Sequence, residues 1–504
     1  MPQKTLLLLA LLAPLAARLP SQTALDPARV EALARSAFEK FHPKGMALAV
    51  VQDGEPLVEI GLGERGDGGP VTPRTLFNIA SCSKAFTAAL VAMAVSEGKL
   101  GWDDPVVRHL PEFRMQDPWI TAHMTIADLL SHRCGLVTFA GDLLWYGSDY
   151  SDEEVLARID KLPIRQRFRD EFGYQNLMYM VAGMILGRIY QKPWEDLVEE
   201  RILRPLGMED SRACAQRLPE GAEKALPFID GEPVEDHVFR ACKPAAAMYS
   251  SVHDLVLWER LLLSGGKLGE TRLLAGGALA ELWRPRVRIG PSTGADPTDL
   301  RGYGMGWFVW PHRGAKLVEH DGGMPGFLSK VSLIPSEGFG FVVLNNANDG
   351  ILNEAVKAGL LLARAGQDGE AGIARFARIA ERVREREKAR KAEREARRVP
   401  GTKPSLPLEA YAGRYEDEVY GPAEVSLAEG RLHVVLLPSR RRLHGDLSHW
   451  HLDVFRVDFP DRFLPFALFR FEIGTGGEVE GFRIDCPIPD FDFGALDFRR
   501  VRKD

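Results

Sequence analysis

Cysteine is scarce in this chain of 504 residues, and its spacing excludes the common metal-binding patterns. The five cysteines stand far apart, so no CxxC pair of the zinc-site type occurs. An odd number leaves at least one free thiol if any disulfide forms. A bridge between Cys214 and Cys242 is conceivable, but the sequence alone cannot pair them. We therefore expect no resident metal ion.

A strong charge of one sign and long apolar runs are also missing. The net charge of -6 is small for this length, so we expect neither nucleic acid nor an anionic membrane surface as a partner. A Gly-rich phosphate loop of the Walker type is absent, and we expect no cofactor. After the first few dozen residues no apolar stretch is long enough to cross a bilayer, so no stable membrane span is expected.

The N-terminus is the exception to this lack of apolar runs. Lys4 precedes an apolar stretch over residues 6–17, which has the length of a secretory signal rather than of a transmembrane helix. A cut after Ala24 leaves a small residue at the last position of the signal, although Gln22 fits the third-last position poorly. We expect residues 1–24 to be a signal peptide of a secreted or periplasmic protein. The alternative is a simple hydrophobic N-terminal helix.

The length of the chain predicts more than one domain. Residues 25–365 read as mixed α and β, with a strand pair at 46–51 and 57–60 joined by an Asp-Gly turn. Further strands are expected at 330–335 and 340–345, and helical patterns fill the middle of this region. Strands at both ends with helices between them predict one sheet that is closed by the two ends of the domain.

The composition changes twice after this region. Residues 366–404 are rich in Ala, Glu, Lys and Arg, with basic residues in excess, and predict an exposed charged helical linker. Residues 405–504 change to short alternating strands with Gly-containing turns, which predicts a small all-β barrel or sandwich. The strands expected there cover residues 423–427, 431–437, 450–457, 467–473 and 479–484.

Three short motifs could carry chemistry. In the first, Ser81 and Lys84 are three residues apart at the start of a helical pattern, so they share one helix face. Serine is a weak nucleophile until a base takes its proton, and a lysine can be that base if burial lowers its pKa. Taken alone, the spacing also fits a helix-capping serine and a surface lysine.

The other two motifs lie much later in the chain. Tyr174 and Asn176 stand just before an apolar helix, where Tyr could relay protons and Asn could grip a substrate carbonyl. His320 and Asp321 precede Gly322 and Gly323, whose lack of a side chain would let a ligand approach the backbone. Taken alone, the first is equally an ordinary turn with a buried tyrosine, and the second a Gly-rich turn.

The order of these motifs strongly resembles the serine β-lactamase and penicillin-binding protein superfamily, nearest its class-C-like and esterase branch. The resemblance runs from roughly residue 30 to residue 362 and includes four further segments: LLSHRCGL at 129–136, ILRPLGM at 202–208, PAAAMYSSVHDL at 244–255 and YGMGWF at 303–308. It implies an α+β fold, in which an antiparallel sheet is flanked by helices and carries a helical subdomain. Residues from 408 onward resemble a β-rich C-terminal domain of unknown function that is found fused to such hydrolases.

The resemblance also implies roles. Ser81 would form an acyl-enzyme on an ester, amide or lactam, with Lys84 as the base and Tyr174 sharing the proton. Asn176, His320, Gly322 and Gly323 would bind the substrate, a small molecule or peptide, and the backbone N–H groups of Ser81 and Gly323 would form the oxyanion hole. His320 stands where many relatives have Lys, which puts lactam specificity in doubt. Esterase, D-amino-acid peptidase and weak β-lactamase remain open, and nothing indicates the oligomeric state.

Two other features of the sequence permit a different interpretation. His449, His451 and Asp453 alternate like the start of a metallo-hydrolase site, but no histidine follows to complete a ligand set, so we expect a strand with solvent-facing polar residues. A non-catalytic binding or sensing protein that retains the fold is the second functional class. The presence of Ser81, Lys84 and Tyr174 together favours the enzyme.

Overall fold

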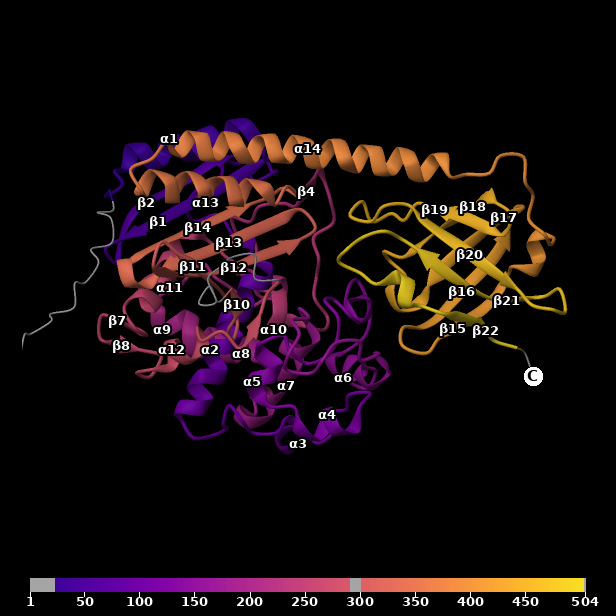
Figure 1. Cartoon of the computed structure of the whole chain (residues 1–504), viewed down its shortest axis with the longest axis horizontal. Coiled ribbons are helices and arrows are strands. Elements are labelled where there is room, and N and C mark those ends of the chain that lie inside the picture. Colours follow the sequence, from indigo (N-terminus) through magenta and orange to yellow (C-terminus); the bar gives the residue numbers. More distant parts are fainter. Residues whose placement is uncertain (1–22, 291–300, 503–504) are drawn as a thin grey trace, which may run out of the picture.

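A computed structural model describes residues 23–290 and 301–502. The predicted signal segment therefore lies, up to residue 22, outside the described residues. The first domain is built on an eight-stranded antiparallel sheet in the order β2-β1-β14-β13-β12-β11-β10-β9 (Figure 1). Its strands are β1 (Gly45–Gln52), β2 (Glu55–Gly63), β9 (Val287–Arg288), β10 (Gly302–Tyr303), β11 (Phe308–His312), β12 (Ala315–Met324), β13 (Phe327–Ile334) and β14 (Phe339–Asn345).

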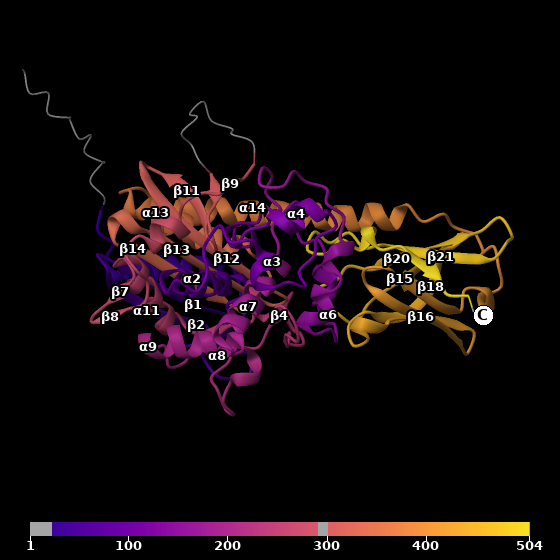
Figure 2. The ribbon, with the colours of Figure 1, turned by 90° about the horizontal axis from the view of Figure 1, so that it is seen from below.

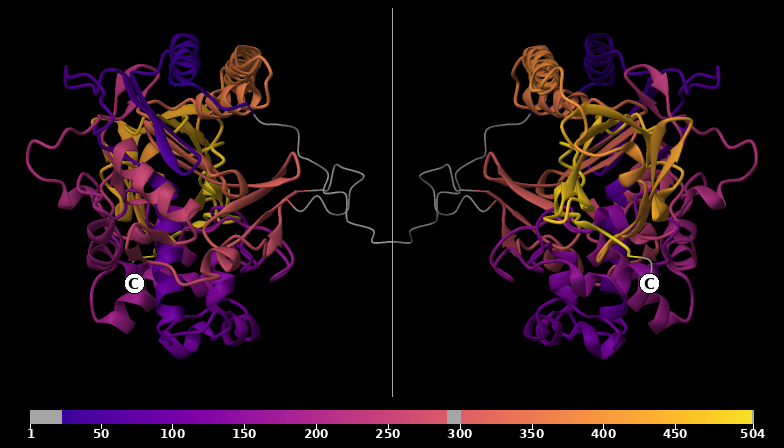
Figure 3. Two further views of the ribbon diagram at one scale, coloured as in Figure 1. Left: turned by 90° about the vertical axis from the view of Figure 1, so that its left-hand side faces the viewer. Right: turned by 90° about the vertical axis from the view of Figure 1, so that its right-hand side faces the viewer.

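The pairing of β1 with β14 confirms that the two ends of the domain close one sheet. β1 and β14 are buried along almost their whole length, because helices cover both faces of the sheet at this place. On the outer face lie α1 (Pro27–Phe41), α13 (Ile351–Arg364) and the start of α14 (Gly369–Ala396), whose buried apolar residues form one core with the sheet. Figure 3 shows α1 and α14 end on, above the sheet.

The opposite face carries the predicted helical subdomain (Figure 2). Its longest members are α2 (Ser83–Ser96), α7 (Leu177–Tyr190) and α11 (Val252–Leu263). Both α2 and α7 are apolar nearly all round and almost completely buried, as expected for helices inside a core. The short helices around them are α3 (Val106–His109), α4 (Pro118–His123), α5 (Ile126–Leu130), α6 (Asp152–Leu156), α8 (Trp194–Val198), α9 (Arg204–Leu206), α10 (Lys243–Ala246) and α12 (Ala278–Leu282).

The C-terminal region is a closed eight-stranded antiparallel barrel. Its strands are β15 (Gly413–Asp417), β16 (Gly421–Ala428), β17 (Arg431–Leu436), β18 (His444–His451), β19 (Val454–Val457), β20 (Ala467–Ile473), β21 (Val479–Asp485) and β22 (Phe498–Arg500). β15 pairs with β22 and so closes the barrel, which removes the exposed strand edges that a small sheet would present. Helix α14 leads from the first domain to this barrel (Figure 1).

The single strand expected at residues 450–457 is wrong. β18 and β19 form a hairpin there, and Leu452 turns the chain with a left-handed φ of 48°. The side chains of His449, His451 and Asp453 bond to other protein groups. His449 Nε2 bonds the Leu452 carbonyl oxygen at 2.9 Å, His451 Nδ1 accepts from the Val399 N–H, and Asp453 accepts from Ser405 and Tyr411.

All five cysteines are buried and unpaired, so the conceivable Cys214–Cys242 bridge is not formed. Across residues 23–290 and 301–502, no helix combines the length and the apolar character that a membrane crossing needs.

Candidate active site

Ser81 lies on a 3₁₀ turn, Ala80–Cys82, that leads directly into α2. Ala80 adopts φ 45°, which an L-residue with a side chain rarely takes, so the surrounding structure must hold this turn in place. Two hydrogen bonds do so: the Ala80 N–H donates to Asn78 Oδ1 at 2.7 Å, and Ser329 Oγ donates to the Ile79 carbonyl oxygen at 2.7 Å. The Ser81 side chain is thereby presented partly exposed at the end of a buried helix.

Lys84 is fully buried one turn along from Ser81. Its Nζ lies 3.0 Å from Ser81 Oγ, 2.6 Å from Asn176 Oδ1 and 3.0 Å from the Ala245 carbonyl oxygen. A neutral amine has two N–H donors and one lone pair. If the donors serve the amide and the carbonyl, which can only accept, the lone pair faces the Ser81 hydroxyl, as a general base requires.

The pKa values separate Lys84 from Tyr174 as candidates for that base. Burial lowers the pKa of Lys84 to about 7, so a large fraction of the amine is neutral near pH 7. Burial raises the pKa of Tyr174 well above its usual value, and a hydrogen bond with Ser81 opposes that rise only in part. Tyr174 therefore stays protonated and can donate, whereas Lys84 can accept. The Lys84 Nζ lies 4.8 Å from the centre of the Tyr174 ring.

Asn176 lies at the N-terminus of α7 and, in this structure, contacts protein groups on both sides of its amide. Its Oδ1 accepts from Lys84, and its Nδ2 donates to Asp142 Oδ2 at 2.6 Å. The expected grip on a substrate carbonyl would therefore compete with these two bonds. Asp142 is a site residue that the sequence analysis missed. Its side chain is 2% exposed, and burial raises its pKa to about 7.

His320 lies on β12 and also has two protein partners. Its Nδ1 lies 2.6 Å from the Asp321 carbonyl oxygen, which can only accept, so Nδ1 carries the proton. Nε2 then accepts from the Tyr303 hydroxyl at 2.8 Å. Burial lowers the pKa of His320 to about 3, with Lys84 adding to the effect, so the ring is neutral at physiological pH. His320 is only 1% exposed, so its side chain is almost completely buried in this structure.

The two glycines of β12 occupy different surroundings. Gly322 is buried, and a Cβ there would lie 2.2 Å from both the Ile79 carbonyl oxygen and Ser329 Oγ. Its missing side chain lets β12 lie against the turn that carries Ser81. Gly323 is exposed, and a Cβ there would meet only the Leu328 side chain, at 3.5 Å.

We expect Gly322→Ala to inactivate the protein and Gly323→Ala to leave it active. The added methyl at 322 must displace the Ser81 turn or β12, at a cost of about 1–3 kcal/mol in folding free energy, whereas the methyl at 323 makes an ordinary contact and removes no N–H. Melting temperature and ester hydrolysis, measured on both variants, check this. An active Gly322→Ala enzyme of wild-type stability would contradict the close approach.

The guanidinium group of Arg133, the residue after His132, is bonded to other protein groups. Its Nε donates to Asp128 Oδ1 at 2.7 Å, and Arg169 binds the same carboxylate. A terminal N–H of Arg133 also donates to the Arg286 carbonyl oxygen at 3.2 Å. The fully buried Asp128 side chain thus neutralises part of the positive charge of these two arginines.

Two family models match this chain, one in each domain. The family model Beta-lactamase matches residues 31–365, and the model Domain of unknown function (DUF3471) matches residues 397–500. Unguisins hydrolase ungD' of Aspergillus campestris is 31% identical over 338 residues, which cover 62% of this chain and 60% of that relative. The match thus spans less than two thirds of that relative's length.

Two solved structures share the fold. The octameric penicillin-binding protein homologue from Pyrococcus abyssi aligns with a TM-score of 0.59 and 19% identity, and covers 94% of this chain and 99% of its own. A class C beta-lactamase aligns with a TM-score of 0.56 and 20% identity over 67% of this chain and 95% of its own. At these identities the likeness concerns the fold alone.

Proposed function

Because the chain belongs to the beta-lactamase family over residues 31–365, we propose that it is a serine hydrolase with Ser81 as its nucleophile and Lys84 as the general base. The observation that carries the proposal is the contact between Lys84 Nζ and Ser81 Oγ at 3.0 Å, made by a buried amine whose pKa is lowered to about 7. An amine at this distance can take the serine proton, and the lowered pKa leaves a large fraction of it neutral near pH 7.

In the first half of the reaction, the Ser81 proton moves to Lys84 Nζ while Oγ bonds to the substrate carbonyl carbon. The negative charge on the carbonyl oxygen would be met by the backbone N–H groups of Ser81 and Gly323. The bond to the leaving group then breaks, and a proton reaches that group from Lys84 by way of the Tyr174 hydroxyl. The product of this half is the acyl-Ser81 enzyme.

In the second half, water attacks the acyl carbon and loses its proton to the Lys84–Tyr174 pair. The Ser81 oxygen leaves with a proton, which restores the free enzyme. A fluorophosphonate probe tests the assignment: intact-protein and peptide mass spectrometry should find one adduct, on Ser81. An adduct on another serine would refute the nucleophile, and no adduct would favour a non-catalytic binding or sensing protein.

The same site supports neutral esters or amides as the substrate class, in preference to lactams that carry a carboxylate. Many relatives have lysine where His320 stands, and this histidine is neutral and bonded to Tyr303. Arg133, the nearest alternative by sequence, is paired with Asp128. A substrate carboxylate would therefore lack the cation that many relatives provide.

We predict that kcat/KM for a short-chain aryl ester exceeds that for a cephalosporin. Losing a hydrogen bond to a charged group costs on the order of 1.5–3 kcal/mol, or about ten- to hundredfold in binding. His320→Lys should raise kcat/KM for the cephalosporin relative to the ester. Steady-state kinetics on both proteins check this, and a wild-type preference for the cephalosporin, or no relative gain in the variant, would refute it.

Export of the protein rests on the sequence of the N-terminal segment. Lys4 and the apolar run 6–17 support cleavage near Ala24 and a secreted or periplasmic location. Mass spectrometry of the protein from its native cell should find a chain without the first ~24 residues, as expected of a cleaved signal. An intact Met1 would contradict this.

A further inference from the structure

Asp142 bonds to Asn176, which in turn bonds to Lys84. Asp142 therefore determines which end of the Asn176 amide group points toward Lys84. A carboxylate offers acceptors, so it selects the Nδ2 side of the amide, and the Oδ1 side must then face Lys84. The two bonds, at 2.6 Å each, connect Asp142 to Lys84 through a single side chain. Without Asp142, the amide could turn its N–H₂ group toward Lys84, which would leave the amine facing a donor instead of an acceptor.

The segment that carries Asp142 is fastened to the barrel four residues further on. The hydroxyl of Tyr146 donates to Asp461 Oδ2 at 2.8 Å, and both side chains are buried. Arg442 holds the same carboxylate at 3.1 Å, and Ser439 Oγ donates to the Tyr146 carbonyl oxygen at 3.2 Å. The Tyr146 ring packs at 4.4 Å, centre to centre, against Phe491 of the barrel. These contacts tie one short segment to both the catalytic amide and the second domain.

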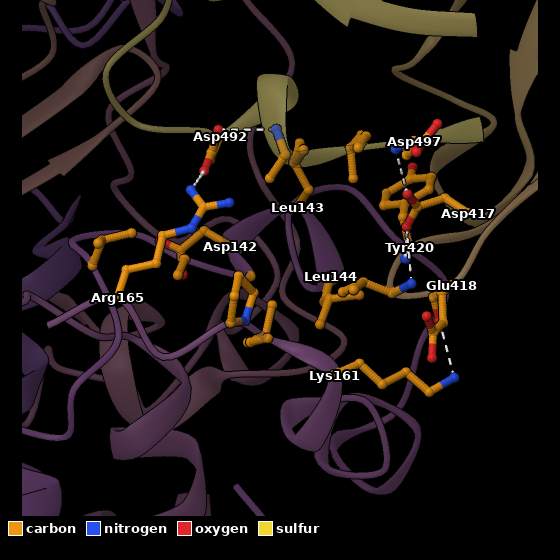
Figure 4. Close-up of a pocket in the computed structure, with 18 of the residues that line it drawn as sticks. Asp142, Leu143, Leu144, Lys161, Arg165, Asp417, Glu418, Tyr420, Asp492 and Asp497 are labelled. Atoms are coloured by element: carbon orange, nitrogen blue, oxygen red, sulfur yellow. Dashed lines mark hydrogen bonds and ion pairs between the residues drawn. The ribbon is translucent and has the colours of Figure 1, made fainter. Parts of the chain in front are cut away.

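Residues of both domains line a pocket of about 740 Å³ next to this segment. Figure 4 shows Asp142, Leu143 and Leu144 on one side of it and Tyr420, Asp492 and Asp497 of the barrel on the other. Leu143 and Leu144 line this pocket and are also buried in the hydrophobic core of the first domain. The bonds made by Asp142 and Tyr146 add polar anchors at the two ends of the segment.

We propose that Asp142 is a positioning residue for the Lys84–Asn176 pair, and that the C-terminal barrel, through Tyr146, holds Asp142 in place for catalysis. This inference rests on the proposed roles of Ser81 and Lys84. It gives the barrel, which matches a domain of unknown function, a part in the hydrolysis reaction itself.

The electrostatics provide a readout that a purely structural role would not produce. The Asp142 carboxylate is among the groups that raise the pKa of Lys84 against the lowering effect of burial. The other groups around Lys84 are Cys82, Tyr174, Tyr179, His132, His320 and Cys242, and Asp490 of the barrel faces Asp142. Burial raises the pKa of Asp142 itself to about 7, so its charge is present mainly above that pH, and removing the charge should lower the pKa of Lys84.

The first experiment measures the rate of fluorophosphonate labelling of Ser81 between pH 5 and pH 9. Asp142→Asn keeps an acceptor for Asn176 but loses the charge, so the midpoint of the acid limb should fall by about half a pH unit or more, with labelling at pH 9 within about tenfold of wild type. Asp142→Ala leaves the Asn176 N–H₂ group without its acceptor, and labelling should fall about ten- to hundredfold at every pH.

The matched control is Asp254→Asn. Asp254 is also almost fully buried and accepts from Ser211, but no contact joins it to Lys84 or Asn176. Its variant should keep the wild-type midpoint whatever it does to stability. An unshifted midpoint in Asp142→Asn, or an equal shift in both variants, would overturn the positioning role.

The second experiment tests the barrel in the full-length chain. Tyr146→Phe keeps the ring against Phe491 and removes only the bond to Asp461, so labelling should slow about three- to tenfold, as for one lost hydrogen bond. Lys161→Met removes a different interdomain bond, to the Glu418 carbonyl oxygen at 3.0 Å, and should leave the rate unchanged. Equal rates in the two variants would overturn the role of the barrel.

Failure of the proposed function is distinguishable from failure of this inference. If Ser81 is not the nucleophile, the wild-type protein takes no label at Ser81 at any pH. If only the inference fails, wild-type Ser81 is labelled with its acid limb, and the Asp142 and Tyr146 variants follow their controls.

Discussion

Replacing Ser81 with alanine is expected to abolish turnover, with a fall in kcat/KM on the order of 10⁴ to 10⁶, as for other covalent catalysts that lose their nucleophile. Acyl transfer has no route without the hydroxyl that bonds to the substrate carbonyl carbon. The fold should survive, because Ser81 is partly exposed and Lys84 keeps its contacts with Asn176 and Ala245. Ester hydrolysis and thermal unfolding, measured on the same preparation, check both halves of this expectation.

Ser83→Ala is the matched control for that experiment. Ser83 is two residues away and fully buried, and its Oγ accepts from the Met248 N–H at 3.2 Å. The variant leaves a buried donor unpaired, so it should lose about 1–3 kcal/mol of stability and yet hydrolyse the ester. Full activity in Ser81→Ala together with loss of activity in Ser83→Ala would mean that the wrong serine was assigned.

The parts of the site that could be predicted from the sequence are those set by local spacing. Ser81 and Lys84 meet because they are three positions apart where a turn leads into one helix, and the apolar pattern after Asn176 predicts the helix that begins there as α7. The closure of the sheet by both ends of the domain followed from apolar strands at residues 46–51 and 340–345. Local spacing fixes the contact between Ser81 and Lys84 and the start of α7, whereas the pairing of β1 with β14 was inferred from strands at the two ends of the domain.

Asp142 could not be predicted in this way, because its contact with Asn176 joins residues 34 positions apart and depends on how the helical subdomain packs. The available signal was a lone acidic residue just before the apolar sequence LLWY, where an unpaired carboxylate would be costly to bury. The burial of His320 could not be predicted for the same reason, because it also depends on a contact with a distant residue. Tyr303, whose hydroxyl bonds the His320 ring, lies on β10, which is separated from β12 by β11.

The missed turn at Leu452 has a different cause. Residues 450–457 are apolar and polar in alternation, which is typical of one strand, and no glycine or proline marks a break. The turn is formed instead by a leucine in the left-handed region, held by the bond between its N–H and Thr402 Oγ1 at 3.0 Å and by the Asp453 contacts with Ser405 and Tyr411. Those partners lie about 40 to 50 residues earlier, outside any local window.

The second large effect concerns the protonation of Lys84. A charged ammonium has no lone pair, so only the neutral form can take the Ser81 proton. Because the pKa of Lys84 is lowered to about 7, kcat/KM for a neutral ester should fall about tenfold per pH unit below pH 7 and level off above it. A lysine with its ordinary pKa would instead give activity that still rises at pH 9.

A second buried lysine in the same domain shows why this position is special. Lys330 is also fully buried, but Asp321 and Glu354 lie 2.5 and 2.8 Å from its Nζ, and these carboxylates raise its pKa. Lys84 has no carboxylate in direct contact, only an amide, a hydroxyl and a carbonyl oxygen. Burial therefore determines that the pKa of Lys84 is lowered, and the neutral amine is available as a base.

Lys84→Met should accordingly lower kcat/KM by about a thousandfold or more and remove the acid limb near pH 7 from whatever activity is left. Tyr174→Phe is the control, since it removes the other candidate for the base. This variant should hydrolyse the ester more slowly but keep the acid limb. The pKa of the Tyr174 phenol is raised, so the phenolate is not formed near pH 7. The pH dependence of kcat/KM in wild type and both variants decides between them. A limb that persists in Lys84→Met and disappears in Tyr174→Phe would transfer the role of base to the tyrosine.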